Sequence, residues 1–217
     1  MYQKYFKRLV DLTISILALP VIMLITIPVA IAIKVEDKGP VFYCSERIGK
    51  DFQKFTIYKF RSMKVDAPDL RNDDGSTYNA KADTRVTKIG KFLRETSIDE
   101  LPQFINVIKG DMSIIGPRPG LASNMNTYKE DEKDKVLVKP GITGYTQAYF
   151  RNSLNMREKR LKDAWYANNV SFLLDLKIFL ATIVTVLKRE GIYTRKRSLN
   201  SIRNEEFKNK STSTKEL

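Results

Sequence analysis

A long apolar run near the start of the chain is the clearest pattern in the sequence. The 22 residues from Leu12 to Ile33 carry no charge and are rich in Ile, Leu and Val. As a helix they would rise about 33 Å, which is enough to cross the hydrocarbon core of a membrane. The run is too long for the apolar part of a signal peptide, and no small-residue cleavage site follows it. We therefore predict a membrane helix.

Two prolines inside this run, Pro20 and Pro28, favour a bent helix over a straight span. Each removes one helical hydrogen bond, and a sharp bend is the usual outcome. Basic residues precede and follow the run, so the positive-inside rule assigns no orientation. A re-entrant helix, which leaves the membrane by the face that it entered, explains both features. We predict that residues 1–36 form such an anchor, with a plain transmembrane helix as the alternative.

The pattern beyond the anchor predicts a small, helix-rich α/β domain with short strands over residues 37–194. Apolar and aromatic runs predict strands at Val41–Tyr43 and Phe55–Arg61. The period of two places Lys59 and Arg61 on the same face of the second strand, so two cations point the same way.

Helical patterns cover residues 156–168 and 170–188, and the second of these is apolar but interrupted by two charges. Such a helix suits the surface of a membrane better than its interior, so we expect amphipathic helices at the interface. The polar stretch 67–84 predicts a loop. Residues 195–217 are basic and polar, and we predict a disordered tail there.

The composition indicates anionic partners and limits the chemistry. The chain has 38 Lys and Arg against 25 Asp and Glu, a formal net charge of +13. Nucleic acid, phosphorylated metabolites or an acidic membrane surface are the expected partners. With no histidine and one cysteine, a histidine base, an intrachain disulfide and a Cys–His zinc site are excluded. Carboxylates, lysine, arginine, hydroxyls and oxygen-bound Mg²⁺ remain.

The adjacent carboxylates Asp99 and Glu100 have two interpretations. Ser97 and Glu100 fit a capping box at the start of a helix that runs to about Ile108, where acidic residues favour the helix dipole. Pro102 fits the first turn of that helix only if Asp99 is the cap. Alternatively, the pair faces a phosphorylated substrate, with one carboxylate as the nucleophile and the other as a metal ligand. The spacing alone favours the cap.

Cations and glycine-rich turns surround the acid pair in the sequence. Arg94 lies in the basic stretch before it, and Arg118 lies after it between two prolines and two glycines. That rigid frame suits a guanidinium that binds a phosphate, although an exposed structural turn fits it equally well. Neither this turn nor the one at 139–144 is a Walker or dinucleotide fingerprint.

A set of motifs in fixed order resembles the bacterial sugar transferase family, the monotopic phosphoglycosyl transferases, and in particular the branch that transfers bacillosamine phosphate. The resemblance runs from about Tyr2 to Tyr193. The motifs are Lys7-Arg8-x-x-Asp11, Gly39-Pro40-Val41-Phe42, Tyr58-Lys59-Phe60-Arg61-Ser62-Met63, Ser97-Ile98-Asp99-Glu100-Leu101-Pro102-Gln103, Asn106 to Ser113, Gly116-Pro117-Arg118-Pro119, Lys139 to Gly144 and Ser171 to Ile178.

The resemblance implies a reaction. In this family the Asp of the pair attacks the β-phosphate of a UDP-sugar, releases UMP and carries the phosphosugar until undecaprenyl phosphate accepts it. By position, Asp99 is the nucleophile and Glu100 is its partner, and both are ligands of Mg²⁺. The residues expected to bind the substrates are Lys59, Arg61, Arg94, Arg118, Gln147 and Arg151.

The resemblance also implies a location and partners. It predicts a monotopic enzyme on the cytoplasmic face of the bacterial inner membrane, in contact with anionic lipids. Its step would be the first membrane step of capsule, exopolysaccharide or glycoconjugate assembly. Tyr145 and Tyr149-Phe150 replace the Trp and Asn-Gly that are common in the family. The sugar therefore stays open, as do the pathway and the oligomeric state.

A membrane-anchored module that binds nucleic acid or lipid without catalysis is the competing function. The net charge and the ten tyrosines are a general argument for it. However, the sequence has no recognised nucleic-acid motif, and its cations cluster around a carboxylate pair that such a module does not need. We therefore expect an enzyme with no nucleic-acid partner.

Overall fold

The structure, a computed structural model, describes residues 2–72, 78, 80 and 82–188. It is helix-rich with two small sheets, which confirms the expected mixed α/β character. One sheet is antiparallel with the order β2-β1-β4, and the other is the parallel pair β3-β5. The strands are β1 (Phe42–Ile48), β2 (Lys54–Phe60), β3 (Ser113–Ile115), β4 (Gly120–Leu121) and β5 (Gly141–Thr143).

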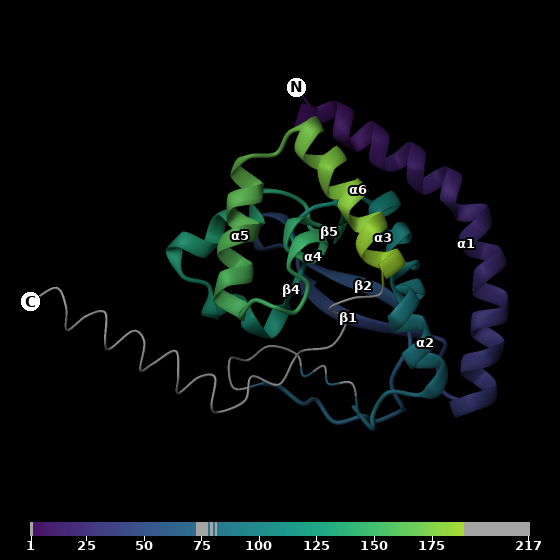
Figure 1. The fold of residues 1–217 in the computed structure, drawn as a ribbon. Helices are drawn as coiled ribbons and strands as arrows, with labels where there is room; N and C mark the ends of the chain where they lie inside the picture. The colour runs from purple at the N-terminus through teal and green to yellow at the C-terminus, as the bar shows by residue number, and fades with distance from the viewer. Residues whose placement is uncertain (1, 73–77, 79, 81, 189–217) are drawn as a thin grey trace, which may run out of the picture.

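Helices surround these sheets, with α1 along one side of the domain (Figure 1). They are α1 (Lys7–Asp37), α2 (Lys88–Thr96), α3 (Gln103–Lys109), α4 (Tyr145–Tyr149), α5 (Met156–Asn168) and α6 (Phe172–Lys188). The two helices predicted at 156–168 and 170–188 are confirmed. The predicted tail 195–217 and residues 73–77, 79 and 81 of the predicted loop lie outside the described residues.

The anchor helix α1 is continuous over 31 residues, with Pro20 and Pro28 inside it. Figure 1 shows α1 as an unbroken helix that changes direction part-way along its length. A re-entrant path through a membrane is not confirmed. Within the described part of the chain, α1 is the one helix that is long and apolar enough to cross a membrane.

Polar contacts join the first turns of α1 to the domain. Arg8 donates to the carbonyls of Val107 and Ile108, at 2.6 and 3.1 Å, and so places a cation at the carboxyl end of α3. Lys7 forms an ion pair at 2.6 Å with the buried carboxylate of Asp175 on α6. The start of α1 is therefore held by two helices.

The buried carboxylate of Asp11 has its partners in β3. It accepts hydrogen bonds from the Ser113 hydroxyl at 2.7 Å and from the Ile114 amide at 3.0 Å. An unpaired carboxylate at this depth would carry a large desolvation cost. These bonds explain how an acidic residue is tolerated at the edge of the apolar run.

The far end of α1 is joined to the same domain. The carboxylate of Glu36 accepts from the amides of Lys88 and Ile89, at 2.7 and 2.9 Å, and thereby caps the amino end of α2. Asp37 pairs with Arg61 at 2.6 Å. Thus α1 places a cation at the end of one helix and an anion at the start of another.

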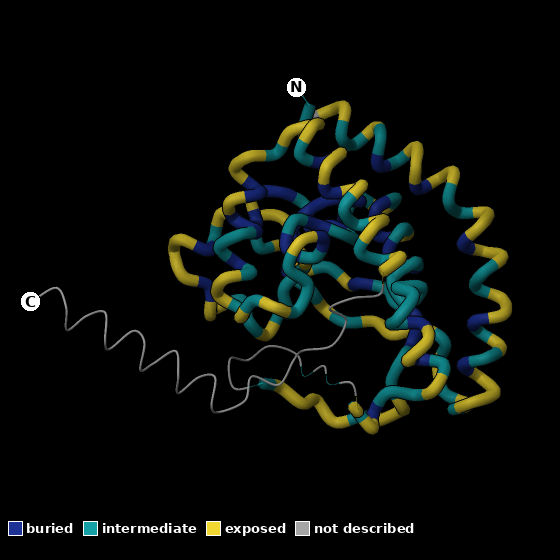
Figure 2. Tube along the Cα trace, in the orientation of Figure 1, coloured by how far each residue is buried: buried dark blue, intermediate teal, exposed yellow. Residues whose placement is uncertain are grey.

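Between these two attachments, the outward side of α1 is exposed (Figure 2). Helix α6 exposes apolar side chains as well. The exposed apolar residues of the two helices include Leu9, Leu17, Val21, Leu24, Ile27, Ile31 and Val35 on α1, and Phe172, Leu173, Leu176, Leu180, Val184 and Leu187 on α6. Apolar surface of this extent is typical of contact with a membrane or another protein.

Asn106 joins α3 to β2 inside the main core. Its side chain is fully buried; Nδ2 donates to the Thr56 carbonyl at 2.7 Å, and Oδ1 accepts from the Tyr58 amide at 3.1 Å. The amide therefore holds the helix that follows the acid pair against the strand that carries Lys59.

We predict that Asn106→Leu lowers the free energy of unfolding by about 2–4 kcal/mol, because it removes the partner of the Tyr58 N–H and of the Thr56 carbonyl. Urea titration in detergent micelles measures the change. The matched control is Asn168→Leu, which removes one exposed hydrogen bond to Asp134 and is expected to change stability by about 0.5 kcal/mol or less. Equal effects of the two substitutions would contradict this role of Asn106.

The structure differs from the sequence prediction in two places around the sheets. The strand predicted at Val41–Tyr43 is longer than expected, because β1 continues to Ile48 and pairs with β2 along its whole length. Helix α2 has no counterpart in the prediction. It has only nine residues, and its Gly90 is a helix-weakening residue; a side chain there would collide with the Ser62 carbonyl.

Candidate functional site

The acid pair lies in a tight connection between α2 and α3. Helix α2 ends at Thr96, and Ser97 turns the chain with a left-handed backbone conformation (φ 59°, ψ 15°). Ile98–Glu100 forms one 3₁₀ turn, and α3 begins at Gln103 with Pro102 as its N-cap residue. The Ser97 side chain makes no capping hydrogen bond, so the predicted capping box is wrong.

The helix predicted from residue 99 therefore starts four residues later. Pro102 is compatible with the start of a helix because its missing N–H is not needed there. As a result, Asp99 and Glu100 lie on a single turn before the helix rather than inside it. Successive residues of a 3₁₀ turn point about 120° apart, so the two carboxylates face different surroundings.

Glu100 is held by cations from two other elements. Lys59 of β2 forms an ion pair with its carboxylate at 2.6 Å, and a guanidinium nitrogen of Arg118 lies 3.6 Å away. Burial opposes the charged form, but the charges of Lys59 and Arg118 prevail and lower the pKa of Glu100 to about 2. Glu100 is thus an anion at every physiological pH.

Asp99 lies in the same cationic field but makes no hydrogen bond or ion pair with any residue that the structure describes. Burial and the neighbouring Glu100 raise the pKa of Asp99 to about 6, although Lys59, Arg94 and Arg118 act in the opposite direction. Its carboxylate is therefore more basic than an ordinary aspartate and is not held by a partner. Both properties suit a nucleophile.

A cleft opens beside Glu100, and most of its polar lining is cationic or amide. The cleft is lined by Arg47, Ile57, Lys59, Glu100, Gln103, Arg118, Pro119, Gly141, Ile142 and Gln147. Three of these residues have a buried polar atom without a hydrogen-bond partner, namely Nε of Arg47, Nε2 of Gln103 and Oε1 of Gln147. Unpaired buried groups carry a free-energy cost, and a bound polar ligand would remove it.

Arg47 is a site residue that the sequence analysis missed. It lies beyond the strand predicted at Val41–Tyr43, but it belongs to β1, where it pairs with Phe55 of β2 and Leu121 of β4. Burial and the neighbouring charge of Arg118 lower the pKa of its guanidinium. The two arginines therefore face the cleft as adjacent like charges, an arrangement that favours an anionic ligand.

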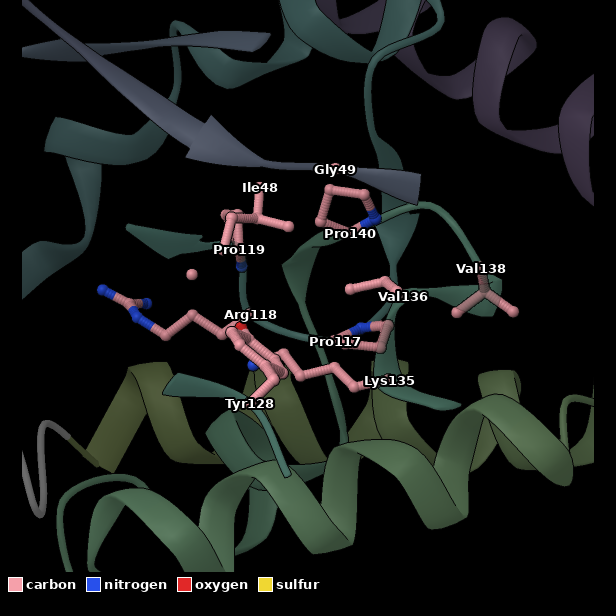
Figure 3. A pocket seen from close by; sticks show the side chains of 11 residues that line it. Ile48, Gly49, Pro117, Arg118, Pro119, Tyr128, Lys135, Val136, Val138 and Pro140 are labelled. Atoms are coloured by element: carbon pink, nitrogen blue, oxygen red, sulfur yellow. The ribbon is translucent and has the colours of Figure 1, made fainter. Parts of the chain in front are cut away.

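The direction of Arg118 is set by two glycine-rich turns that pack together. Beyond β3 and before β5, the backbones of Gly116 and Gly141 approach so closely that a side chain on either one would collide with the other turn. Figure 3 shows the apolar pocket behind this frame, lined by residues that include Pro117, Tyr128 and Pro140, with the Arg118 guanidinium extending to one side.

The remaining predicted substrate ligands have other contacts. Nε of Arg94 donates to the Ser62 hydroxyl at 2.9 Å, and its charge acts on Asp99. The structure thus brings Lys59, Arg94, Arg118 and Gln147 together around the acid pair. Arg61 and Arg151 lie elsewhere: Arg61 pairs with Asp37, and Arg151 donates to the Thr185 carbonyl of α6 at 3.0 Å. Substrate binding by these two arginines stays a prediction.

Comparison with known proteins identifies the family. The sequence profile described as "Bacterial sugar transferase" matches residues 2–189. The chain belongs to this family, and the resemblance found in its motifs is confirmed.

Several curated relatives share more than a third of their aligned residues with the chain. It is 43% identical over 189 residues to "Uncharacterized sugar transferase EpsL" of Bacillus subtilis, covering 86% of this chain and 89% of the relative. It is 44% identical over 186 residues to "UDP-glucose:undecaprenyl-phosphate glucose-1-phosphate transferase" of Klebsiella pneumoniae, covering 82% of this chain and 39% of the relative. For "Galactosyl transferase CpsE" of Streptococcus agalactiae the identity is 40% over 193 residues, covering 85% of this chain and 43% of the relative. The chain thus spans less than half of the last two relatives.

Because the two carboxylates have opposite surroundings, we predict that neutralising Asp99 and neutralising Glu100 change the stability of the fold in opposite directions. Asp99 has a folded pKa of about 6 against an ordinary 3.8, so its ionisation destabilises the fold as the pH rises through this range. At pH 8, Asp99→Asn is expected to raise the Tm by a few degrees, and the gain should largely vanish by pH 4. Thermal scans at both pH values measure it.

Glu100→Gln is the matched variant with the opposite sign. The folded pKa of Glu100 is about 2 against an ordinary 4.5, so its stabilising effect is present above pH 4.5 and is lost as the pH falls toward 2. Glu100→Gln should therefore lower the Tm at pH 8, because Lys59 loses its partner. Two shifts of the same sign at pH 8 would show that the carboxylates share one environment.

Proposed function

We propose that this chain transfers a sugar 1-phosphate from a UDP-sugar to undecaprenyl phosphate and releases UMP, with Asp99 as the covalent nucleophile. One observation carries the proposal: Asp99 is a carboxylate of raised pKa without a partner among the described residues, and the next residue, Glu100, lines a cleft with Arg47, Lys59 and Arg118. Two relatives carry the printed name of a UDP-glucose:undecaprenyl-phosphate glucose-1-phosphate transferase, and their identity to the chain supports this substrate class.

In the first half-reaction, a carboxylate oxygen of Asp99 attacks the β-phosphorus of the donor. The bond between this phosphorus and the oxygen bridging to the α-phosphate breaks, so UMP leaves and the phosphosugar stays on Asp99 as an acyl phosphate. A carboxylate needs no general base for this attack, which fits a chain without histidine. Arg47, Lys59 and Arg118 would stabilise the negative charge on the transferring group.

In the second half-reaction, an oxygen of undecaprenyl phosphate attacks the same phosphorus and breaks its bond to Asp99. The product is a polyprenyl-diphosphosugar, and the carboxylate is regenerated. Glu100 stays ionised throughout, because Lys59 and Arg118 hold its pKa at about 2. Its role is to fix these two cations beside the reacting phosphorus.

The donor set also fits Mg²⁺. This ion commonly binds through one or two carboxylates together with substrate phosphates, and Asp99 and Glu100 are the carboxylates present here. Among the described residues, no group of three or more acidic, His or Cys side chains is placed to hold a metal, so phosphate oxygens of the donor would complete the ligand set. When bound, Mg²⁺ would neutralise charge on the diphosphate.

We also propose a location on the cytoplasmic face of the inner membrane, and the attachments of α1 support its monotopic part. A helix that crossed the bilayer would have its two ends on opposite sides. Here both ends contact one polar domain, through Arg8 at the start and Glu36 at the finish. The exposed apolar faces of α1 and α6 would then enter the membrane from one side.

The covalent route predicts a burst of UMP that does not require lipid. Wild-type chain mixed with Mg²⁺ and a panel of UDP-sugars is expected to release at most one UMP per chain and to gain the mass of one phosphosugar. Asp99→Asn should abolish both, because an amide oxygen is a far weaker nucleophile than a carboxylate. UMP assay and intact mass spectrometry measure the two readouts.

The control for this burst is Glu130→Gln, which changes a carboxylate whose side chain is 88% exposed and should leave the burst intact. UMP release that occurs only with undecaprenyl phosphate, and without a mass adduct, would favour direct transfer and reduce Asp99 to a metal ligand.

Arg47 is predicted to bind the donor diphosphate. Arg47→Met keeps much of the aliphatic stem but removes the charge and the unpaired Nε, so the KM for the UDP-sugar should rise about tenfold or more with a smaller change in kcat. Lys54→Met, which removes an exposed cation from β2, is the control and should leave KM within twofold. A fall in kcat at unchanged KM would show that Arg47 acts outside donor binding.

A further inference from the structure

A second cationic site lies at the carboxyl end of α3, at its C-cap residue Gly110. Gly110 has a left-handed backbone conformation (φ 95°). A Cβ placed on it would be 3.6 Å from a guanidinium nitrogen of Arg8 and 3.6 Å from Nζ of Lys139. The two cationic groups are therefore no farther apart than twice that distance, and they flank one point that carries no side chain.

Lys139 has no hydrogen bond or ion pair with any residue in the described part of the chain. Burial and the neighbouring charge of Arg8 lower the pKa of Lys139, and Lys50 acts in the same direction. The two acidic groups whose charges reach Lys139 have other partners: Asp11 accepts from β3, and Asp111 lies 3.6 Å from Lys109. Their negative charges act on Lys139, but among the described residues no carboxylate forms an ion pair with Lys139 or Arg8.

The dipole of α3 accounts for one of these cations but not for both. Arg8 donates to the last carbonyls of the helix at 2.6 and 3.1 Å, which satisfies the end of α3. Lys139 approaches the same end without donating to any of its carbonyls. Two adjacent like charges without an anion repel each other, and an anion bound between them would remove that repulsion.

The position of the cluster indicates where such an anion comes from. Arg8 belongs to the first turn of α1, and its neighbours Tyr5, Phe6 and Leu9 are exposed. Exposed aromatic and apolar residues beside a cation are typical of the membrane interface, where lipid phosphates lie. The Arg8 side chain turns from this exposed surface toward the domain, where it donates to the carbonyls of Val107 and Ile108.

We propose that Arg8 and Lys139, with Lys50 nearby, bind the phosphate of an anionic membrane lipid above Gly110. The site lies at the opposite end of α3 from the acid pair, and its ligand is a headgroup rather than a reactant. The proposal rests on the membrane association of α1 proposed above, but not on the transfer reaction. Lipid binding without any sugar transfer would uphold this site and overturn the transferase, and the reverse result would do the opposite.

Native mass spectrometry of the detergent-purified full chain tests the site. Phosphatidylglycerol and phosphatidylcholine are titrated separately, and inorganic phosphate and undecaprenyl phosphate are used as competitors. Wild type is expected to hold one phosphatidylglycerol in preference to phosphatidylcholine. Lys139→Met should weaken that binding about fivefold or more, the effect of one basic residue at a lipid surface.

Two further variants keep the test specific. Lys139→Arg restores the cation and should restore binding, which separates loss of charge from damage to the fold. Lys133→Met removes an exposed lysine on another segment and should have no effect. Equal losses in Lys139→Met and Lys133→Met would overturn the site in favour of a general charge effect. Displacement by inorganic phosphate would assign it to free phosphate, and tighter binding of undecaprenyl phosphate would assign it to the acceptor; either result overturns the lipid-headgroup proposal.

Discussion

The buried side-chain amide of Asn106 is the interaction on which the geometry of the site depends. By bonding to backbone groups on both sides of Ile57, it fixes α3 against β2. Lys59 lies two residues farther along that strand, and Glu100 lies just before α3, so the same amide sets the separation of the ion pair. The carbonyl of Asn106 also accepts the three amides that follow α3, and that segment leads into β3 and then to Arg118. One residue thus orients the anion and both of its cations.

In this arrangement, the two neighbouring carboxylates interact unequally with the surrounding cations. Glu100 points at Lys59 and Arg118 and takes the direct contacts. Asp99, one residue earlier on a 3₁₀ turn, points elsewhere and keeps only the more distant field, while the Glu100 charge acts against its ionisation. Pairs of acids whose pKa values are driven apart are a recurrent arrangement at sites that need one permanent anion and one reactive group. The ionised carboxylate of Asp99 therefore lowers the stability of the fold, because it has no partner among the described residues.

Much of this site was predictable from the sequence, because its residues come from short motifs with strong chemical signals. The acid pair, Lys59 and Arg118 belong to this set. Arg47 was not predictable, since its position depends on antiparallel pairing along the whole of β1, which no local pattern reveals. Helix α2 was not predicted because Gly90 weakens its helical pattern. Pro102 lies at the start of α3, but the predicted helix began at an earlier residue. Local propensity failed where tertiary contacts decide. The cap predicted at Ser97 does not form, and the first amides of α2 donate to Glu36, which is 52 residues away from Lys88.

That distant cap also ties the long apolar helix α1 to the turn that carries the acid pair. The segment α2, the acid-bearing turn and α3 run consecutively, and α1 holds this segment at both outer ends: Glu36 at the first amides of α2, and Arg8 at the last carbonyls of α3. Each contact pairs a charge with the helix end of opposite partial charge. The acid pair is therefore fixed relative to α1 rather than joined to it by a flexible linker. If α1 lies in a membrane, its depth also fixes the depth of Asp99, and the proposed nucleophile is then held at a constant height relative to the lipid phosphates.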